Sequence, residues 1–190
     1  GSNNVGLGYD ALANNTTASN NTAVGYKALF TNTTGSENAG LSDAALQLNT
    51  TGNNNSAAGR GALNVNTTGS NNSAFGHLAL SANTTASNNT AVGYQSLYSN
   101  VTGTSLVAVG WKSLESNTTT GNTAVGMDSA RATTTGADNS AVGHDALRYN
   151  TTGASNTVLG KQALFSNTTA SLNTAVGYQA LYANIEGTRN

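Results

Sequence analysis

Polar and apolar residues follow one pattern that recurs about every 17 positions along this chain. One copy, residues 21–37, reads N-T-A-V-G-Y-K-A-L-F-T-N-T-T-G-S-E, with apolar residues at Val24 and Leu29. A glycine marks the same place in almost every copy, Ser42 replaces it once, and one step is 16 residues long. The glycines are Gly8, Gly25, Gly59, Gly76, Gly93, Gly110, Gly126, Gly143, Gly160 and Gly177. Eleven copies account for nearly the whole chain, which predicts a stack of repeats.

The first residues of each copy alternate in character. Alternation over residues 22–26 places Val24 on one face of an extended segment and the small Ala23 and Gly25 on the other, which predicts a strand. A second short segment carries Leu29. Both positions form columns, whose main members are Val24, Val92, Val109, Val142 and Val176 in the first and Leu29, Leu97, Leu114, Leu147 and Leu181 in the second. We predict that these two columns form the core.

Each copy closes on a polar corner, Asn32-Thr33-Thr34-Gly35. Asn and Gly tolerate the positive φ of tight corners, and Thr favours extended backbone. The asparagine recurs in register, so its amide is expected to hydrogen-bond to the same amide in the coils above and below. The column includes Asn32, Asn100, Asn117, Asn150 and Asn167. The chain contains no proline, which suits a ladder that needs every backbone N–H.

Together these features predict an all-β fold, a parallel β-solenoid (β-roll) of about eleven 17-residue coils. With strands ~4.8 Å apart, the rod would be about 50 Å long. A helical solenoid fits less well, because Thr, Asn, Gly and Ser dominate each copy and 17 residues are too few for paired helices. We expect residues 1–190 to be a single array cut from a longer one, since the first residues fit the end of a copy and Asn190 fits the start of one.

Composition and charge argue against several classes of binding partner. Only 7 residues are basic and 8 acidic, for a net charge of −1, which argues against binding to nucleic acid or to an anionic membrane. The chain has no cysteine, so disulfides and thiolate metal sites are excluded. No apolar run is long enough to predict membrane insertion in this segment.

A coil with one Val and one Leu buries little apolar surface against the entropy of ordering about 17 residues, so each chain is expected to need a partner. The small residues at Ala23 and Gly25 form a flat face against which another subunit could pack. The alternative is that these small residues let the two walls of one thin coil approach each other. We favour the packing of subunits.

Few residues are candidates for catalysis or metal binding. His77 and His144 are four coils apart, ~19 Å by stacking alone, and so cannot share a site. Asp128 and Asp145 occupy the same slot of successive coils, and paired carboxylates can hydrolyse glycosides. A solvated charge ladder in which Lys112 offsets Asp128 is the preferred interpretation, because no insertion shapes a substrate pocket. We therefore expect no enzymatic activity, no catalytic residue, no metal and no cofactor.

Aromatic residues follow the repeat glycine in several copies. Tyr94, Trp111 and Tyr178 are the candidates for surface contact with a glycan, because aromatic faces stack on the apolar faces of sugars. The interpretation we favour is that these rings cover the edge of the coil and protect the core.

The segment N-T-A-V-G-Y-Q-A-L-Y at residues 173–182, with its relatives at residues 89–98 and 139–149, resembles the head repeats of trimeric autotransporter adhesins, the YadA-like family. It also resembles repeat arrays of phage and bacterial tail fibres. The resemblance implies a left-handed β-roll with three chains side by side, outside the cell or on a virion.

Two functions remain from the sequence. The first is a structural or adhesive segment of an extracellular fibre, a homotrimer that projects or mediates attachment to a glycan or a cell-surface receptor. The second is an ice-binding β-solenoid that uses the repeated Thr33-Thr34 pairs. Adjacent threonines point to opposite faces of a strand, however, whereas an ice-binding plane would need the spacing Thr-x-Thr.

Overall fold

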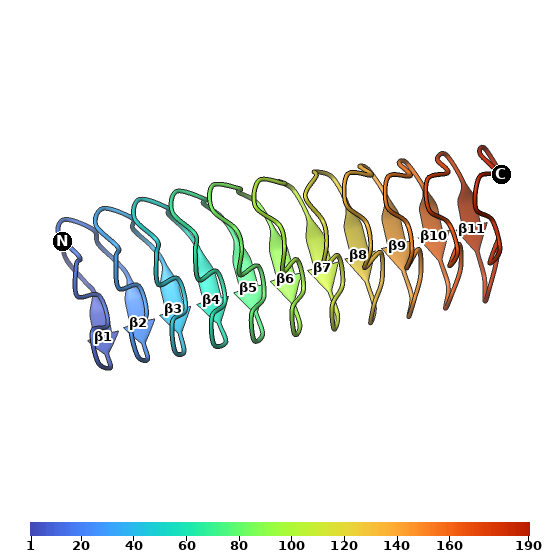
Figure 1. The fold of residues 1–190 in the computed structure, drawn as a ribbon. Helices are drawn as coiled ribbons and strands as arrows, with labels where there is room; N and C mark the ends of the chain where they lie inside the picture. The colour runs from blue at the N-terminus through green and yellow to red at the C-terminus, as the bar shows by residue number, and fades with distance from the viewer.

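The computed structural model describes all residues 1–190 and contains one parallel sheet of 11 strands, without helices (Figure 1). The strands are β1 (Val5–Leu7), β2 (Thr22–Val24), β3 (Ala39–Leu41), β4 (Ser56–Ala58), β5 (Ser73–Phe75), β6 (Thr90–Val92), β7 (Val107–Val109), β8 (Thr123–Val125), β9 (Ser140–Val142), β10 (Thr157–Leu159) and β11 (Thr174–Val176). Each strand pairs with the next in sequence, so every turn of the chain lays one coil on the preceding coil. The predicted β-solenoid is confirmed.

Equivalent residues of successive coils lie side by side. Val24 pairs with Leu41, its equivalent in the next coil, and the same register holds along the sheet. The 16-residue coil keeps it as well, because Val109 still pairs with Val125. The missing residue falls in the corner: Asn100 Nδ2 donates to the carbonyl three residues later, whereas Asn117 Nδ2 donates to the carbonyl of Thr119, two residues later. The shortened corner therefore leaves the sheet undisturbed.

Hydrogen bonds between coils continue around the whole circumference. Of 124 backbone–backbone hydrogen bonds, 104 lie outside the strands. The Leu29 N–H, for example, donates to the Ala45 carbonyl of the next coil at 3.0 Å, and the Lys27 N–H donates to the Tyr9 carbonyl of the preceding coil at 2.9 Å. The segment around Leu29 is a turn with φ of 52° at Lys27 and 51° at Leu29. The coil thus consists of one short strand and a laddered set of turns.

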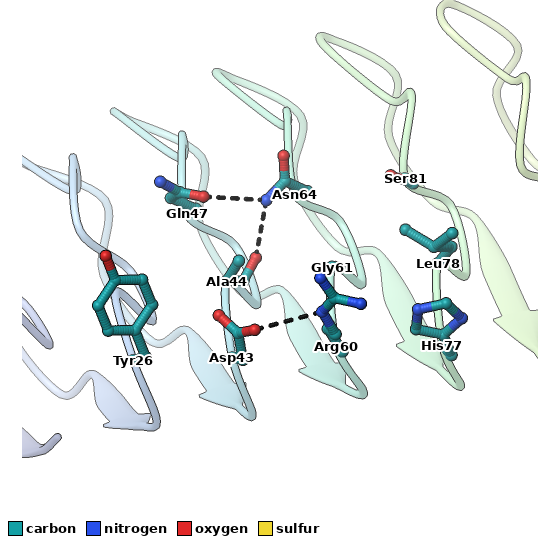
Figure 2. A pocket seen from close by; sticks show the side chains of 10 residues that line it. All are labelled: Tyr26, Asp43, Ala44, Gln47, Arg60, Gly61, Asn64, His77, Leu78 and Ser81. Carbon is teal, nitrogen blue, oxygen red and sulfur yellow. Dashed lines mark hydrogen bonds and ion pairs between the residues drawn. The ribbon is translucent and has the colours of Figure 1, made fainter. Parts of the chain in front are cut away.

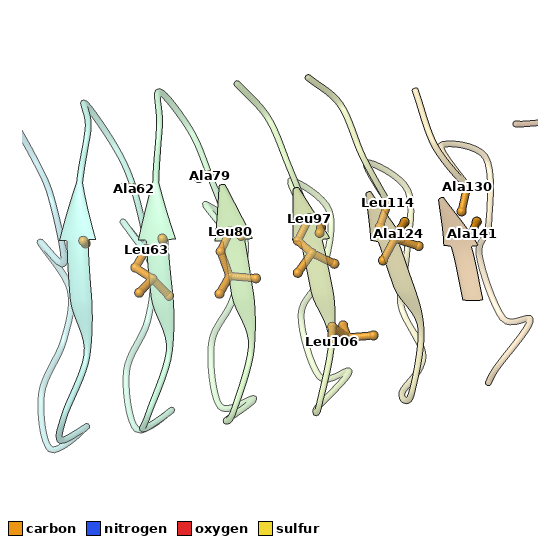
Figure 3. Close-up of a cluster of buried hydrophobic side chains, with 14 of the residues drawn as sticks. Ala62, Leu63, Ala79, Leu80, Leu97, Leu106, Leu114, Ala124, Ala130 and Ala141 are labelled. Atoms are coloured by element: carbon orange, nitrogen blue, oxygen red, sulfur yellow. The ribbon is translucent and has the colours of Figure 1, made fainter. Parts of the chain in front are cut away.

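The core differs from the prediction in one of its two columns. The leucine column is buried, and Leu29, Leu97, Leu114 and Leu147 have no exposed surface; Figure 3 shows its members following one another from coil to coil. In the last coil Leu181 is 36% exposed. The valine column is not core, because the residue that faces inward from each strand is Ala23 and its equivalents.

The predicted inward orientation of Val24, Val92, Val109, Val142 and Val176 is therefore wrong: these side chains project outward from the sheet, and Val176 is 62% exposed. The reason is the thinness of the coil. A Cβ placed on Gly40, in the Ala23 column, would lie 3.4 Å from Leu29 Cγ, so the opposite wall touches the strand directly. The small residues let two walls of one coil approach each other, and the preferred reading of the Ala23 face as a subunit contact is wrong.

The predicted asparagine ladder is present. Asn49 Nδ2 donates to Asn32 Oδ1 at 2.8 Å, and Asn66 Nδ2 donates to Asn49 Oδ1 at 2.7 Å. Asn167 donates likewise to Asn150 at 2.8 Å, and Asn100 makes a longer contact with Asn83 at 3.4 Å. Asn117 leaves the ladder at the shortened corner. The sequence predicted positive φ at the Asn32 corner, but Asn32 does not adopt it. Residues of the Asn20, Lys27 and Leu29 columns have positive φ instead.

A second asparagine ladder runs through Asn21, Asn38, Asn55, Asn72 and Asn89. In this ladder the side-chain oxygen accepts the backbone N–H of the next asparagine; Asn38 N to Asn21 Oδ1 measures 2.9 Å. The two ladders meet on one carbonyl, because Gly35 O accepts hydrogen bonds from both Asn32 Nδ2 (2.8 Å) and Asn21 Nδ2 (3.0 Å). Leu106 interrupts the second ladder in the β7 coil, where its side chain is fully buried. Stacking satisfies most of these buried amides, and the exceptions, Asn167 Oδ1 and Asn173 Nδ2, lie near the C-terminal end of the stack.

Candidate functional site

The outer face of the sheet carries an unbroken apolar column, which we call the sheet stripe. Its members are Leu7, Val24, Leu41, Ala58, Phe75, Val92, Val109, Val125, Val142, Leu159 and Val176. Phe75 is 44% exposed and Leu159 is 50% exposed, although both belong to strands that are paired on both sides. Parallel sheets are normally covered on both faces. Here the leucine column covers the inner face, and the outer face is bare in the single chain.

The second outward column of each strand is mostly polar. It contains Thr22, Thr90 and Thr123, with serine at Ser56 and Ser73. The face therefore presents a hydroxyl side chain and an aliphatic side chain two residues apart in most coils. Such a surface offers contact area and shape, and its strand residues include no ionisable side chain that could activate the hydroxyls as nucleophiles.

The predicted aromatic contacts separate into two groups. Tyr94 stacks on Trp111 with ring centroids 6.1 Å apart, and His77 stacks on the other side of Tyr94 at 5.6 Å. Trp111 also lies under the cations of Lys112, at 5.0 Å, and of Arg131. Tyr178 lies four coils beyond Trp111 and is 69% exposed. Tyr94 and Trp111 thus form one stacked group, and Tyr178 stands apart from them.

The charge ladder exists, but its pairing differs from the prediction. Lys112 Nζ binds Glu115 Oε1 at 2.8 Å instead of offsetting Asp128. Arg131 Nε binds Glu115 Oε2 at 2.6 Å, and Arg148 lies between Asp128, at 3.4 Å, and Asp145, at 2.7 Å. The two aspartates are 5% and 4% exposed, so they are buried and not solvated as predicted. Alternating charges zigzag across the β7, β8 and β9 coils.

Glu115 is the centre of this zigzag. Its burial alone would raise the pKa of the carboxyl, but hydrogen bonds from Lys112 and Arg131 outweigh burial and lower the pKa below its ordinary value. The hydrogen bond to Glu115 in turn raises the pKa of Arg131 above its ordinary value. The sequence signal for this cluster was the recurrence of opposite charges three residues apart, Lys112/Glu115, Asp128/Arg131 and Asp145/Arg148, in three successive coils.

The predicted threonine rows do not form a two-row plane. Thr33 Oγ1 donates to the Thr50 carbonyl at 3.1 Å, and Thr50 Oγ1 donates to the Thr67 carbonyl at 3.0 Å. Those hydroxyls are used within the ladder, whereas Thr34 is exposed. The two-residue spacing that an ice-binding plane needs occurs instead between Thr22 and Val24 of the sheet face.

The two histidines are far apart. His77 and His144 follow β5 and β9, in separate parts of the stack. No group of three or more His, Cys, Asp or Glu side chains is placed to hold one metal ion. No helix of sufficient length and apolar character to cross a membrane occurs in the structure. The outer sheet face and the aromatic column are therefore the features with most potential for interaction.

Searches of protein-family models, curated proteins and solved structures found no match to this chain. The resemblance to YadA-like heads and tail-fibre arrays stays a prediction.

Proposed function

We propose that this chain is a structural and adhesive segment of a fibre outside the cell or on a virion, a stiff β-solenoid that assembles as a homotrimer and projects or mediates attachment. The single observation that supports it most is the sheet stripe. A bare parallel sheet face with one apolar side chain per coil is the surface expected to be covered by a partner.

Stiffness is the mechanical half of the proposal. Bending the stack apart at any coil would break hydrogen bonds on all sides, because most backbone hydrogen bonds join neighbouring coils, and the two asparagine ladders add to them except at Leu106 and Asn117. Buried amides left without partners are costly, at roughly 1–3 kcal/mol each. A stack held in this way resists local opening and suits a spacer that must transmit position or force.

A second copy of the chain is the partner that the surface fits best. The stripe runs the length of the stack, so an identical stack lying alongside meets it coil by coil, which a compact globular partner cannot do. Closed cyclic assemblies bury such a stripe in every subunit equally. Three is the number implied by the resemblance to YadA-like heads.

Solution mass tests the assembly. Sedimentation or light scattering is expected to give three times the 19.0 kDa of one chain. Val92→Glu combined with Val142→Glu places charges in the stripe and is expected to give single chains with an unchanged circular dichroism spectrum. The matched control, Thr85→Glu with Thr152→Glu, changes exposed corners in the same way and is expected to keep the trimer. A wild-type chain that stays monomeric would refute the assembly.

Ice binding is the second candidate, and one observation favours it: Thr22 and Val24 project from the same face of a sheet whose coils pair in constant register. Val5, Ala39 and Val107 interrupt the hydroxyl column, which weakens the match to a regular lattice. Inhibition of ice recrystallisation by the wild type, lost in the Val92→Glu variant, would support this candidate. Trimeric mass without inhibition would exclude it.

A further inference from the structure

One hollow in the surface is built by a change in side-chain size over two successive coils. The position after Tyr26 carries long side chains in most coils, such as Lys27 and Gln95, but it is Ala44 and Gly61 in the β3 and β4 coils. The result is a groove of about 540 Å³ that crosses four coils (Figure 2). This volume is within the roughly 300–1,000 Å³ of typical small-ligand sites.

The two ends of the groove are aromatic. Tyr26 stacks on Tyr9 with centroids 5.6 Å apart and planes 12° apart, and His77 stacks on Tyr94 at 5.6 Å and 23°. Each ring is thus covered on the side away from the groove. Tyr26 and His77 are three coils apart, about 14 Å, and Asp43 and Arg60 occupy the same column between them (Figure 2).

Polar groups lie between these rings. Arg60 Nε binds Asp43 Oδ2 at 3.3 Å, and both side chains are open to solvent. On the opposite wall Asn64 Nδ2 donates to the Ala44 carbonyl at 3.0 Å and to Gln47 Oε1 at 3.2 Å. These two hydrogen bonds fix both amides and leave Gln47 Nε2 and Asn64 Oδ1 facing outward without partners in the chain. Figure 2 shows the arrangement.

We propose that this groove binds a neutral oligosaccharide of two or three pyranose rings lying along the stack. A pyranose has an apolar face that packs on an aromatic ring and a rim of hydroxyl pairs. Planar bidentate groups pair with such hydroxyls, and the groove offers a guanidinium, a carboxylate and two held amides. A flat apolar ligand fits less well, because only Ala44, Gly61 and Leu78 supply an apolar floor.

The inference deepens the proposed attachment role by naming a ligand class, and it rests on that role only for its biological purpose. The groove belongs to one chain, so saccharide binding and trimer mass are separate measurements. A trimer that binds no saccharide would refute the saccharide site and leave the proposed assembly standing. Saccharide binding by a monomer would support the site and refute the proposed trimer.

The test uses the intact chain and four named probes: lactose, maltotriose, cellotriose and N,N′-diacetylchitobiose. Saturation-transfer NMR is expected to detect binding of at least one probe. Tyr26→Ala and His77→Ala should each weaken that binding about tenfold through loss of one stacking face, whereas Tyr26→Phe should retain it. Tyr149→Ala, which removes an exposed ring outside the groove, is the matched control and should change nothing.

A filled groove provides the sharper variant. Ala44→Gln introduces the residue that the same column carries at Gln95, where the backbone has φ of 52° compared with 55° at Ala44. The backbone therefore accepts the change, and binding should be lost while the melting curve is kept. The inference is overturned if none of the four probes binds, if Ala44→Gln leaves binding intact, or if Tyr149→Ala weakens it as much as Tyr26→Ala.

Discussion

The column of repeat glycines contains one residue that is not glycine, and this residue gives the most direct test of the fold. Gly25 has φ of 131°, and its equivalents lie between 121° and 137°. Ser42 occupies the column with φ of 137°, in a region that residues with a side chain rarely adopt. Such strain costs about 1–3 kcal/mol. We predict that Ser42→Gly stabilises the protein.

The structure shows where the strain is expressed. In this column each N–H donates to the carbonyl of the sheet-stripe residue one coil before, at 2.7–2.8 Å in every coil except one. The exception is Gly59 N to Leu41 O at 3.1 Å, directly above Ser42. A Cβ on the preceding Gly25 would lie 2.5 Å from the carbonyl carbon of Ser42, so the column has no room for one without displacement of the next coil.

The expected gain is smaller than the strain. Glycine adds freedom to the unfolded chain, which costs about 0.5–1 kcal/mol. The net stabilisation is therefore about 1 kcal/mol, a rise of about 2–4 °C in Tm for a chain of this size. Scanning calorimetry measures the rise, and amide hydrogen exchange at Gly59 should slow at the same time.

Two matched variants control the experiment. Ser99→Gly makes the same substitution where φ is ordinary, and it should lower Tm through the unfolded state alone. Gly93→Ser places a side chain where a Cβ would lie 2.4 Å from the Gly110 carbonyl oxygen, and it should lower Tm by more. An unchanged or lower Tm for Ser42→Gly would show that the column does not require glycine.

Three further predictions follow from the core, the asparagine ladder and the ion pairs. Leu97→Ala removes a fully buried side chain and should lower the free energy of unfolding by about 2–5 kcal/mol, whereas Val92→Ala on the outer face should cost a single chain much less; equal losses in denaturant titrations would contradict the assignment of inside and outside. Asn66→Ala should cost about 2–4 kcal/mol in the same titrations, because Asn49 Oδ1 loses its donor and Asn83 Nδ2 loses one acceptor, and a loss below 1 kcal/mol would mean that the ladder adds little. Glu115 has a lowered pKa, so its contribution to stability is present above its ordinary pKa and is lost as the pH falls through the lowered value. The difference in Tm between wild type and Glu115→Gln should therefore be constant near neutral pH and shrink in acid. A difference independent of pH would exclude the ion pairs as its source.

Much of the fold could be predicted from the period alone. Repetition at 17 residues fixes the stacking, the register and the asparagine column of Asn32, because identical residues must lie above one another if the coils have equal length. Even the 16-residue coil does not disturb the sheet, since its deletion is absorbed in the corner after Asn117. In the candidate site, the stacking of Tyr94 on Trp111 follows from the same argument.

The direction of each strand face could not be predicted. Alternation shows which residues share a face, but it does not show which face is inside, and three-residue strands offer no further pattern. Hydrophobicity favoured the larger Val24 as core. The deciding term is space: the opposite wall, with Leu29 in a turn of positive φ, lies so close that Ala23 fills the interior. Leucine rarely adopts this conformation, so composition gave no warning of the turn.

The two outward columns of the sheet differ in a way that solvent exposure alone does not explain. Both face away from the core, yet the Thr22 column is mostly hydroxyl-bearing and the Val24 column is apolar in all eleven coils. Burial within the coil cannot be the reason, because Phe75, Leu159 and Val176 remain exposed. Apolar surface in water is unfavourable at about 25 cal/mol per Å², so a column that is apolar at one outward position and polar at the other, two residues away, is the pattern expected if the proposed assembly makes its contact along that line only. A second stack that met the sheet along the Val24 column, with its edge at the Thr22 column, would account for both.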